Sequence, residues 1–204
     1  AAQTAAEFIQ KTKPNFTPKV GIVLGSGLGA LADLIEDKTI LSYADIPGFP
    51  VSTVSGHAGE LVLGHLNGVP VVCLKGRAHS YEGTADEKVK TLIRTFKALG
   101  CEVYLATNAA GSLHAEVGAG ELVAITDHIN FQPTNPLVGA NDEAFGPRFV
   151  SMDAAYDTEL RQALHQTANQ LEINLHEGVA NHFSLAVNED GTEFLMNPNM
   201  WHFS

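Results

Sequence analysis

Four short stretches of small and polar residues together offer the groups that bind an oxyanion such as phosphate. An arginine can hold a phosphate group through two parallel hydrogen bonds. A serine hydroxyl donates another, and a histidine can donate or titrate near neutral pH. The stretches are Gly25-Ser26-Gly27, Gly56-His57-Ala58-Gly59, Gly76-Arg77-Ala78-His79 and Asn108-Ala109-Ala110-Gly111. We interpret them as parts of one anion site.

Each of these residues also has an ordinary structural explanation. Arg77 could form a surface ion pair, and His57 and His79 could be satisfied polar residues at strand ends. Asn108 could cap its loop, and Tyr81 could be a half-buried aromatic residue. The interpretation therefore depends on the stretches coming together, and not on any single residue.

The glycine-rich residues 25–29 separate a predicted strand, residues 20–24, from residues 28–35, whose apolar positions have helical spacing. Backbone amides at such a turn and a helix N-terminus both favour an anion. The pattern does not match the dinucleotide fingerprint, and no acidic residue at the end of a second strand supports that interpretation. It is not the P-loop either, because no Gly-Lys-Ser/Thr follows it. By itself it fits an anion site and an ordinary tight turn equally well.

Strands that alternate with helices predict an α/β fold, in which ligands bind at the carboxyl ends of the strands. Three of the four stretches follow such ends. Asn67-Gly68 predicts a tight hairpin. The predicted strands are 20–24, 39–43, 60–66, 69–74, 102–106 and 120–126, and the predicted helices are 5–11, 84–98 (or from 86) and 157–171.

The second half of the chain is less regular. Residues 127–148 form a long segment rich in Asn, Pro and Gly, and a loop of that length is usually functional. Residues 179–187 and 192–196 are predicted to pair as a hairpin around a turn at Asn188-Glu189-Asp190-Gly191.

Composition narrows the class of protein. The 204 residues predict a single domain over 1–204. A formal net charge of −11 argues against nucleic-acid and membrane-surface partners. We expect no membrane span and no signal peptide. Cys73 and Cys101 are interpreted as buried free thiols of a cytoplasmic protein rather than a disulfide.

Two further kinds of site are not supported by the spacing of the residues. The other histidines show no metal-ligand spacing, so we expect no metal. Ser26 lacks the Gly-x-Ser-x-Gly elbow and is a poor candidate for a hydrolase nucleophile.

Five motifs, in this order and at this spacing, resemble the trimeric purine nucleoside phosphorylases, and most closely the bacterial enzymes for inosine, guanosine or xanthosine. The resemblance covers about residues 8–178. The motifs are 20–34 (VGIVLGSGLGALADL), 47–64 (PGFPVSTVSGHAGELVLG), 75–83 (KGRAHSYEG), 107–113 (TNAAGSL) and 127–157 with its NDEAFGPRF core.

The resemblance implies a mixed central β-sheet, a smaller sheet that completes a distorted barrel, and flanking helices. It implies reversible phosphorolysis of purine ribo- or deoxyribonucleosides to free base and (deoxy)ribose 1-phosphate. Inorganic phosphate is then a co-substrate, and no metal or organic cofactor is needed.

The resemblance also assigns roles to residues. His79 and Asn108 are implied as catalytic residues, Tyr81 as the residue packed on the ribose, and Phe145 as an aromatic lent to a neighbouring subunit of a homotrimer. The phosphate residues would be Ser26, His57, Arg77, His79 and the amide of Ala109. The residues that line the purine would be Ala109, Ala110 and Gly111.

The resemblance ends after residues 175–179. There the family continues with a Gly-Pro-x-Phe-Glu-Thr segment, whose glutamate binds the purine, whereas this chain has an atypical C-terminal segment, residues 180–204. We therefore carry two hypotheses: a working phosphorylase, and a truncated, catalytically impaired homologue that binds phosphate or associates with other subunits. A nucleosidase that uses water is a third, which Ser26, Arg77 and His79 disfavour.

Overall fold

The computed structural model forms two compact units, Ala1–Ala109 and Ala110–Ser204, which we describe separately. The single domain predicted from the sequence stays a prediction. The predicted site residues Ser26, His57, Arg77, His79 and Tyr81 lie outside the described residues. The structure describes residues 1–25, 27–50, 59–76, 86–112, 114–130, 135, 137–182, 184–186 and 194–196.

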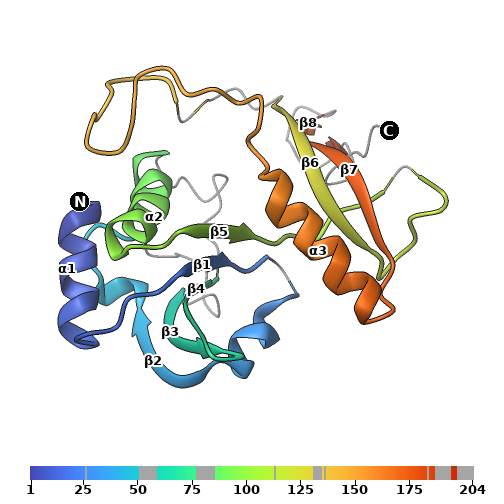
Figure 1. Cartoon of the computed structure of the whole chain (residues 1–204). Helices are drawn as coiled ribbons and strands as arrows, with labels where there is room; N and C mark the ends of the chain where they lie inside the picture. The colour runs from blue at the N-terminus through green and yellow to red at the C-terminus, as the bar shows by residue number, and fades with distance from the viewer. Residues whose placement is uncertain are drawn as a thin grey trace. The chain divides into compact units, whose positions relative to one another are not determined.

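The first unit contains a five-stranded mixed sheet with the order β2-β3-β4-β1-β5 (Figure 1). β3 runs antiparallel to β2 and β4, whereas β1 runs parallel to β4 and β5. The predicted mixed central sheet is therefore confirmed, while the distorted barrel stays a prediction. The strands are β1 (Val20–Val23), β2 (Glu36–Ser42), β3 (Glu60–Leu66), β4 (Val69–Lys75) and β5 (Val103–Ala106).

The β3–β4 hairpin confirms the prediction made from Asn67-Gly68. Leu66 pairs with Val69 across the turn. The φ angles are 47° at Asn67 and 78° at Gly68, both positive, as a type I′ turn requires.

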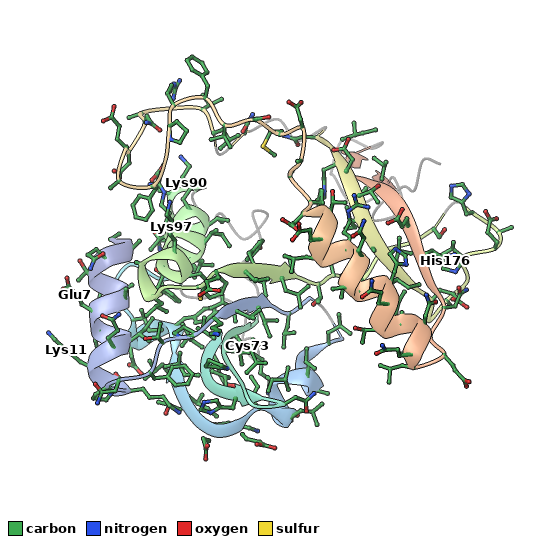
Figure 2. All side chains as sticks on the ribbon, in the orientation of Figure 1. Glu7, Lys11, Cys73, Lys90, Lys97 and His176 are labelled. Carbon is green, nitrogen blue, oxygen red and sulfur yellow. The ribbon has the colours of Figure 1, made fainter. Side chains whose placement is uncertain are left out.

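Alternating side chains of the sheet build a core on each of its faces. On one face, α1 (Ala2–Thr12) and α2 (Asp86–Leu99) pack through Ile9, Leu92 and Phe96 against Leu61 and Leu74. Glu7 and Lys11 lie on the outer side of α1 (Figure 2). The core of the opposite face consists of Ile22, Leu24, Ala32, Ile35, Val62, Val71 and Cys73.

The helix expected after the glycine-rich turn is only a 3₁₀ helix, η1 (Gly29–Leu34). The chain enters β2 at Glu36, so only six residues are available for the helix, and Ala32 is its one buried residue among those described. The expected contribution of an α-helix N-terminus to an anion site at residues 25–29 is therefore corrected, because a short 3₁₀ helix has few aligned peptide dipoles.

The second unit contains β6 (Leu122–Asn130) and β7 (Leu175–His182), which pair in parallel, and the helix α3 (Thr158–Gln170). Asp157 caps α3, and its carboxylate accepts a hydrogen bond from the Leu160 amide at 2.8 Å. The helix predicted over 157–171 is confirmed.

Two predicted boundaries in this unit were wrong. β6 continues to Asn130, so the irregular segment does not begin at residue 127, and β7 begins at Leu175 instead of residue 179. The cause is pairing between the strands, which joins Leu122 to Leu175 and Asn130 to His182 and so takes polar residues into both strands.

The last described strands are β8 (Ser184–Ala186) and β9 (Phe194–Met196), which pair in an antiparallel manner. The predicted hairpin is thus confirmed for its described parts, residues 184–186 and 194–196. The turn predicted at Asn188-Glu189-Asp190-Gly191 lies outside the described residues, and the atypical character of residues 180–204 stays a prediction.

Both cysteines are free thiols. Cys73 is buried within the sheet (Figure 2), whereas Cys101 is only partly buried. The prediction of free thiols is confirmed, and that of full burial holds for Cys73 alone.

Candidate functional site

The carboxyl ends of β1, β4 and β5 lie at one edge of the mixed sheet. Val23 of β1 pairs with Leu74 of β4 and with Ala106 of β5. The pairing continues past the strands, because the Leu24 amide donates to the Leu74 carbonyl at 3.0 Å and the Thr107 amide to the Val23 carbonyl at 2.9 Å. The segments that lead to Ser26, Arg77 and Asn108 therefore leave the sheet at the same edge.

The fourth stretch reaches this edge through β3. Because β3 is antiparallel to β4 and Glu60 pairs with Lys75, the chain enters β3 from Gly59 where it leaves β4 at Gly76. The described ends of all four stretches thus gather at one edge of the sheet. Ligands of α/β sheets bind at such carboxyl ends.

Gly25 and Thr107 hold the ends of β1 and β5 close together. The Thr107 hydroxyl accepts a hydrogen bond from the Gly25 amide at 3.1 Å and donates to the Val23 carbonyl at 3.2 Å. A Cβ atom at Gly25 would lie 2.5 Å from the Cα of Asn108 and 2.6 Å from the Thr107 carbonyl oxygen. Only glycine permits this approach, which brings the turn after β1 against Asn108.

The structure describes five of the predicted site residues. Asn108, which is half-buried, and Ala109, which is exposed, end the first unit. Ala110 and Gly111 begin the second unit, and Phe145 follows a turn in which its amide donates to the Asp142 carbonyl at 3.0 Å. The roles that the resemblance gives to these residues stay predictions.

Lys75 is a cation close to the glycine-rich turn. Its Nζ lies 3.3 Å from the Asp33 carboxylate, and its Cε would lie 3.6 Å from a Cβ atom at Gly29. Because Asp33 balances this charge, Lys75 is not added to the candidate anion site, and the roles of Arg77 and the histidines stay predictions.

Thr107 is a structural contributor that the sequence analysis did not single out. The signal was its position directly before Asn108 at the end of an apolar strand. A hydroxyl at a strand end often bonds nearby backbone groups, but its actual partners lie more than eighty residues away in sequence.

Neither a metal-ligand cluster nor a membrane-spanning helix is present among the described residues. No three His, Cys, Asp or Glu side chains in those ranges are grouped as metal ligands would be. A membrane-spanning helix needs about 20 apolar residues, and none of the described helices qualifies.

Comparison with known proteins agrees with the motifs. The sequence profile of the phosphorylase superfamily matches residues 19–181. Purine nucleoside phosphorylase 1 of Bacillus subtilis (strain 168) is 52% identical over 177 residues, which cover 87% of this chain and 65% of the relative. The chain belongs to the purine nucleoside phosphorylase family. The family membership inferred from the five motifs is thereby confirmed, whereas the trimer and the atypical C-terminal segment stay predictions.

Other relatives support the same membership. Purine nucleoside phosphorylase 1 of Geobacillus stearothermophilus is 48% identical over 88% of this chain and 65% of its own length. A crystal structure of a purine nucleoside phosphorylase in complex with ribose-1-phosphate superposes with a TM-score of 0.84 at 41% identity, over 88% of this chain and 68% of that one. The chain thus spans about 65% of the length of the two bacterial family members.

Proposed function

We propose that the chain catalyses the reversible phosphorolysis of purine ribo- and deoxyribonucleosides to free base and (deoxy)ribose 1-phosphate. The observation that carries the proposal is the meeting of Gly25, Gly59, Gly76 and Asn108 at one edge of the sheet. Each of them adjoins or belongs to a stretch that the family resemblance assigns to phosphate. The ribose-1-phosphate complex of a solved relative supports the proposal.

The phosphate half of the proposed site explains how the glycosidic bond would break. Arg77, Ser26, His57, His79 and the Ala109 amide would hold a phosphate dianion. Positive charge develops on the sugar as the base departs, and a bound dianion stabilises that charge. The same phosphate, held in place, then attacks the anomeric carbon.

The purine half of the proposed site explains how the base would leave. Ala109, Ala110 and Gly111 would line the purine, and Tyr81 would pack on the ribose. The departing purine carries developing negative charge, which proton donation at N7 or at the six-position oxygen relieves. We assign the catalytic roles to His79 and Asn108.

The remaining parts of the proposal concern the co-substrate and the assembly. Inorganic phosphate is the co-substrate, and the reaction needs no metal or organic cofactor. The protein is proposed to act in the cytoplasm as a homotrimer in which Phe145 completes the site of a neighbouring subunit.

The sugar product tests the proposed reaction. Purified protein is incubated with inosine and inorganic phosphate, and the sugar is identified by phosphorus NMR. We expect ribose 1-phosphate together with hypoxanthine. Free ribose would instead indicate a nucleosidase, and phosphate binding without any product would indicate the catalytically impaired homologue.

A further inference from the structure

Tyr43 connects two of the chain segments that meet at the candidate site. It follows β2 directly and begins the short 3₁₀ helix η2 (Tyr43–Asp45), and it is 3% exposed. Its hydroxyl donates a hydrogen bond to the Gly76 carbonyl at 3.0 Å. Its amide donates to the Gly59 carbonyl at 2.9 Å.

The ring of Tyr43 also lies directly against Gly59. A Cβ atom at Gly59 would lie 2.1 Å from Cδ2 and 2.3 Å from Cε2 of the ring. The ring leaves no room for a side chain at position 59, so only glycine fits there. The backbone of Gly59 is thus fixed both by the ring and by the hydrogen bond from the Tyr43 amide. One side chain thus fixes Gly59 through packing and Gly76 through its hydroxyl.

The positions of these two glycines give the contacts their significance. Gly59 follows His57 by two residues, and Gly76 directly precedes Arg77. The pairing of Glu60 with Lys75 places Gly59 and Gly76 opposite each other at the site edge of the β3–β4 pair. Tyr43 thus bridges the described ends of two stretches that are predicted to bind phosphate.

We propose that Tyr43 is a positioning residue for phosphate, acting by fixing the backbone from which the His57 and Arg77 stretches extend. This inference rests on the proposed function. A purely structural role would need only the ring, which packs in the core beside Phe49 with ring centroids 5.4 Å apart. The hydroxyl is the part that reaches Gly76, so it separates the two roles.

The Tyr43→Phe substitution removes this hydroxyl and keeps the ring. Because the segment that leads to Arg77 loses one hydrogen-bonded anchor, we expect the KM and Kd for inorganic phosphate to rise about two- to tenfold. The KM for inosine at saturating phosphate should stay unchanged. Phosphate binding is measured by titration calorimetry and the KM values by hypoxanthine release.

Thr95→Val is the matched control, because it also removes a buried hydroxyl from the first unit. Thr95 is 0% exposed, and its hydroxyl donates to the Thr91 carbonyl at 2.7 Å within α2. This variant should bind phosphate as the wild type does. Equal weakening in both variants would reveal general destabilisation and overturn the inference.

Two further outcomes separate this inference from the proposed function. If the wild type binds phosphate and Tyr43→Phe binds it equally well, the positioning role is wrong and the proposed function stands. If the wild type binds no phosphate, both are wrong.

Discussion

At the scale of single residues, Gly25 lies where the ends of β1 and β5 meet, and backbone atoms surround the place of a side chain. We predict that Gly25→Ala lowers the free energy of unfolding by about 1–3 kcal/mol, because the new methyl group would overlap Asn108 and Thr107. The rate of phosphorolysis should also fall, since the turn after β1 must move to make room for the methyl group. Urea denaturation and hypoxanthine release measure the two effects.

Gly118→Ala is the matched control for this substitution. A Cβ atom at Gly118 would meet nothing within 4 Å, so stability and activity should both stay close to those of the wild type. A Gly25→Ala protein that is as stable as Gly118→Ala would contradict the close approach of β1 and β5.

Cys73 gives a prediction about pH. Burial raises the pKa of its thiol from 9.0 to about 11. Between these values the unfolded chain loses the proton and the folded chain keeps it, so stability falls as the pH rises from 9 to 11. The loss is at most about 1.4 kcal/mol per pH unit.

The Cys73→Ala variant tests this assignment. Its free energy of unfolding should fall less steeply over the same pH range. The pKa of Cys101 is also raised to about 11, but that thiol is present in both proteins and its contribution cancels. Equal slopes in the two proteins would show that Cys73 is not the group responsible.

At the scale of elements, Asp157 begins α3 by accepting a hydrogen bond from the Leu160 amide. We predict that Asp157→Ala destabilises the helix by about 1 kcal/mol, because this amide loses its partner at the helix start. Asp157→Asn should retain most of the stability, since an asparagine oxygen can also accept the bond. Urea denaturation compares the variants, and equal losses in both would contradict capping by the side chain.

The sequence predicted the elements whose signals are local. The apolar runs at residues 20–24, 69–74 and 102–106 predicted β1, β4 and β5, and Asn67-Gly68 predicted the hairpin. These signals succeed because strand burial and turn chemistry are set by neighbouring residues.

Features that depend on distant partners were missed. The extents of β6 and β7 are set by pairing between strands about fifty residues apart in sequence. The contacts of Tyr43 with Gly76 and of Thr107 with Gly25 also join distant positions, so no local pattern marks either residue.

At the scale of the whole molecule, the proposed trimer makes the site depend on Phe145 from a neighbouring subunit. We predict that Phe145→Ala and Arg77→Ala are each strongly impaired as separate proteins. Refolding or co-expressing them together should restore part of the activity, because some sites then combine an intact Arg77 with an intact Phe145. Hypoxanthine release and the mass from light scattering are the measurements.

The control for this mixing experiment is a mixture of Arg77→Ala with His79→Ala. Each site would take both Arg77 and His79 from the same subunit. Every site in this mixture therefore lacks one of the two side chains, and no activity should return. A recovery of activity in this control, or none in the Phe145 mixture, would contradict the sharing of Phe145 between subunits.

The most direct test of the central claim is the phosphate dependence of inosine cleavage. Hypoxanthine release is followed with and without inorganic phosphate in the wild type, in Arg77→Ala and in Arg94→Ala, which removes a guanidinium from α2 instead. The account predicts phosphate-dependent release that Arg77→Ala abolishes and Arg94→Ala preserves. Release that is independent of phosphate, or unaffected by Arg77→Ala, would contradict it.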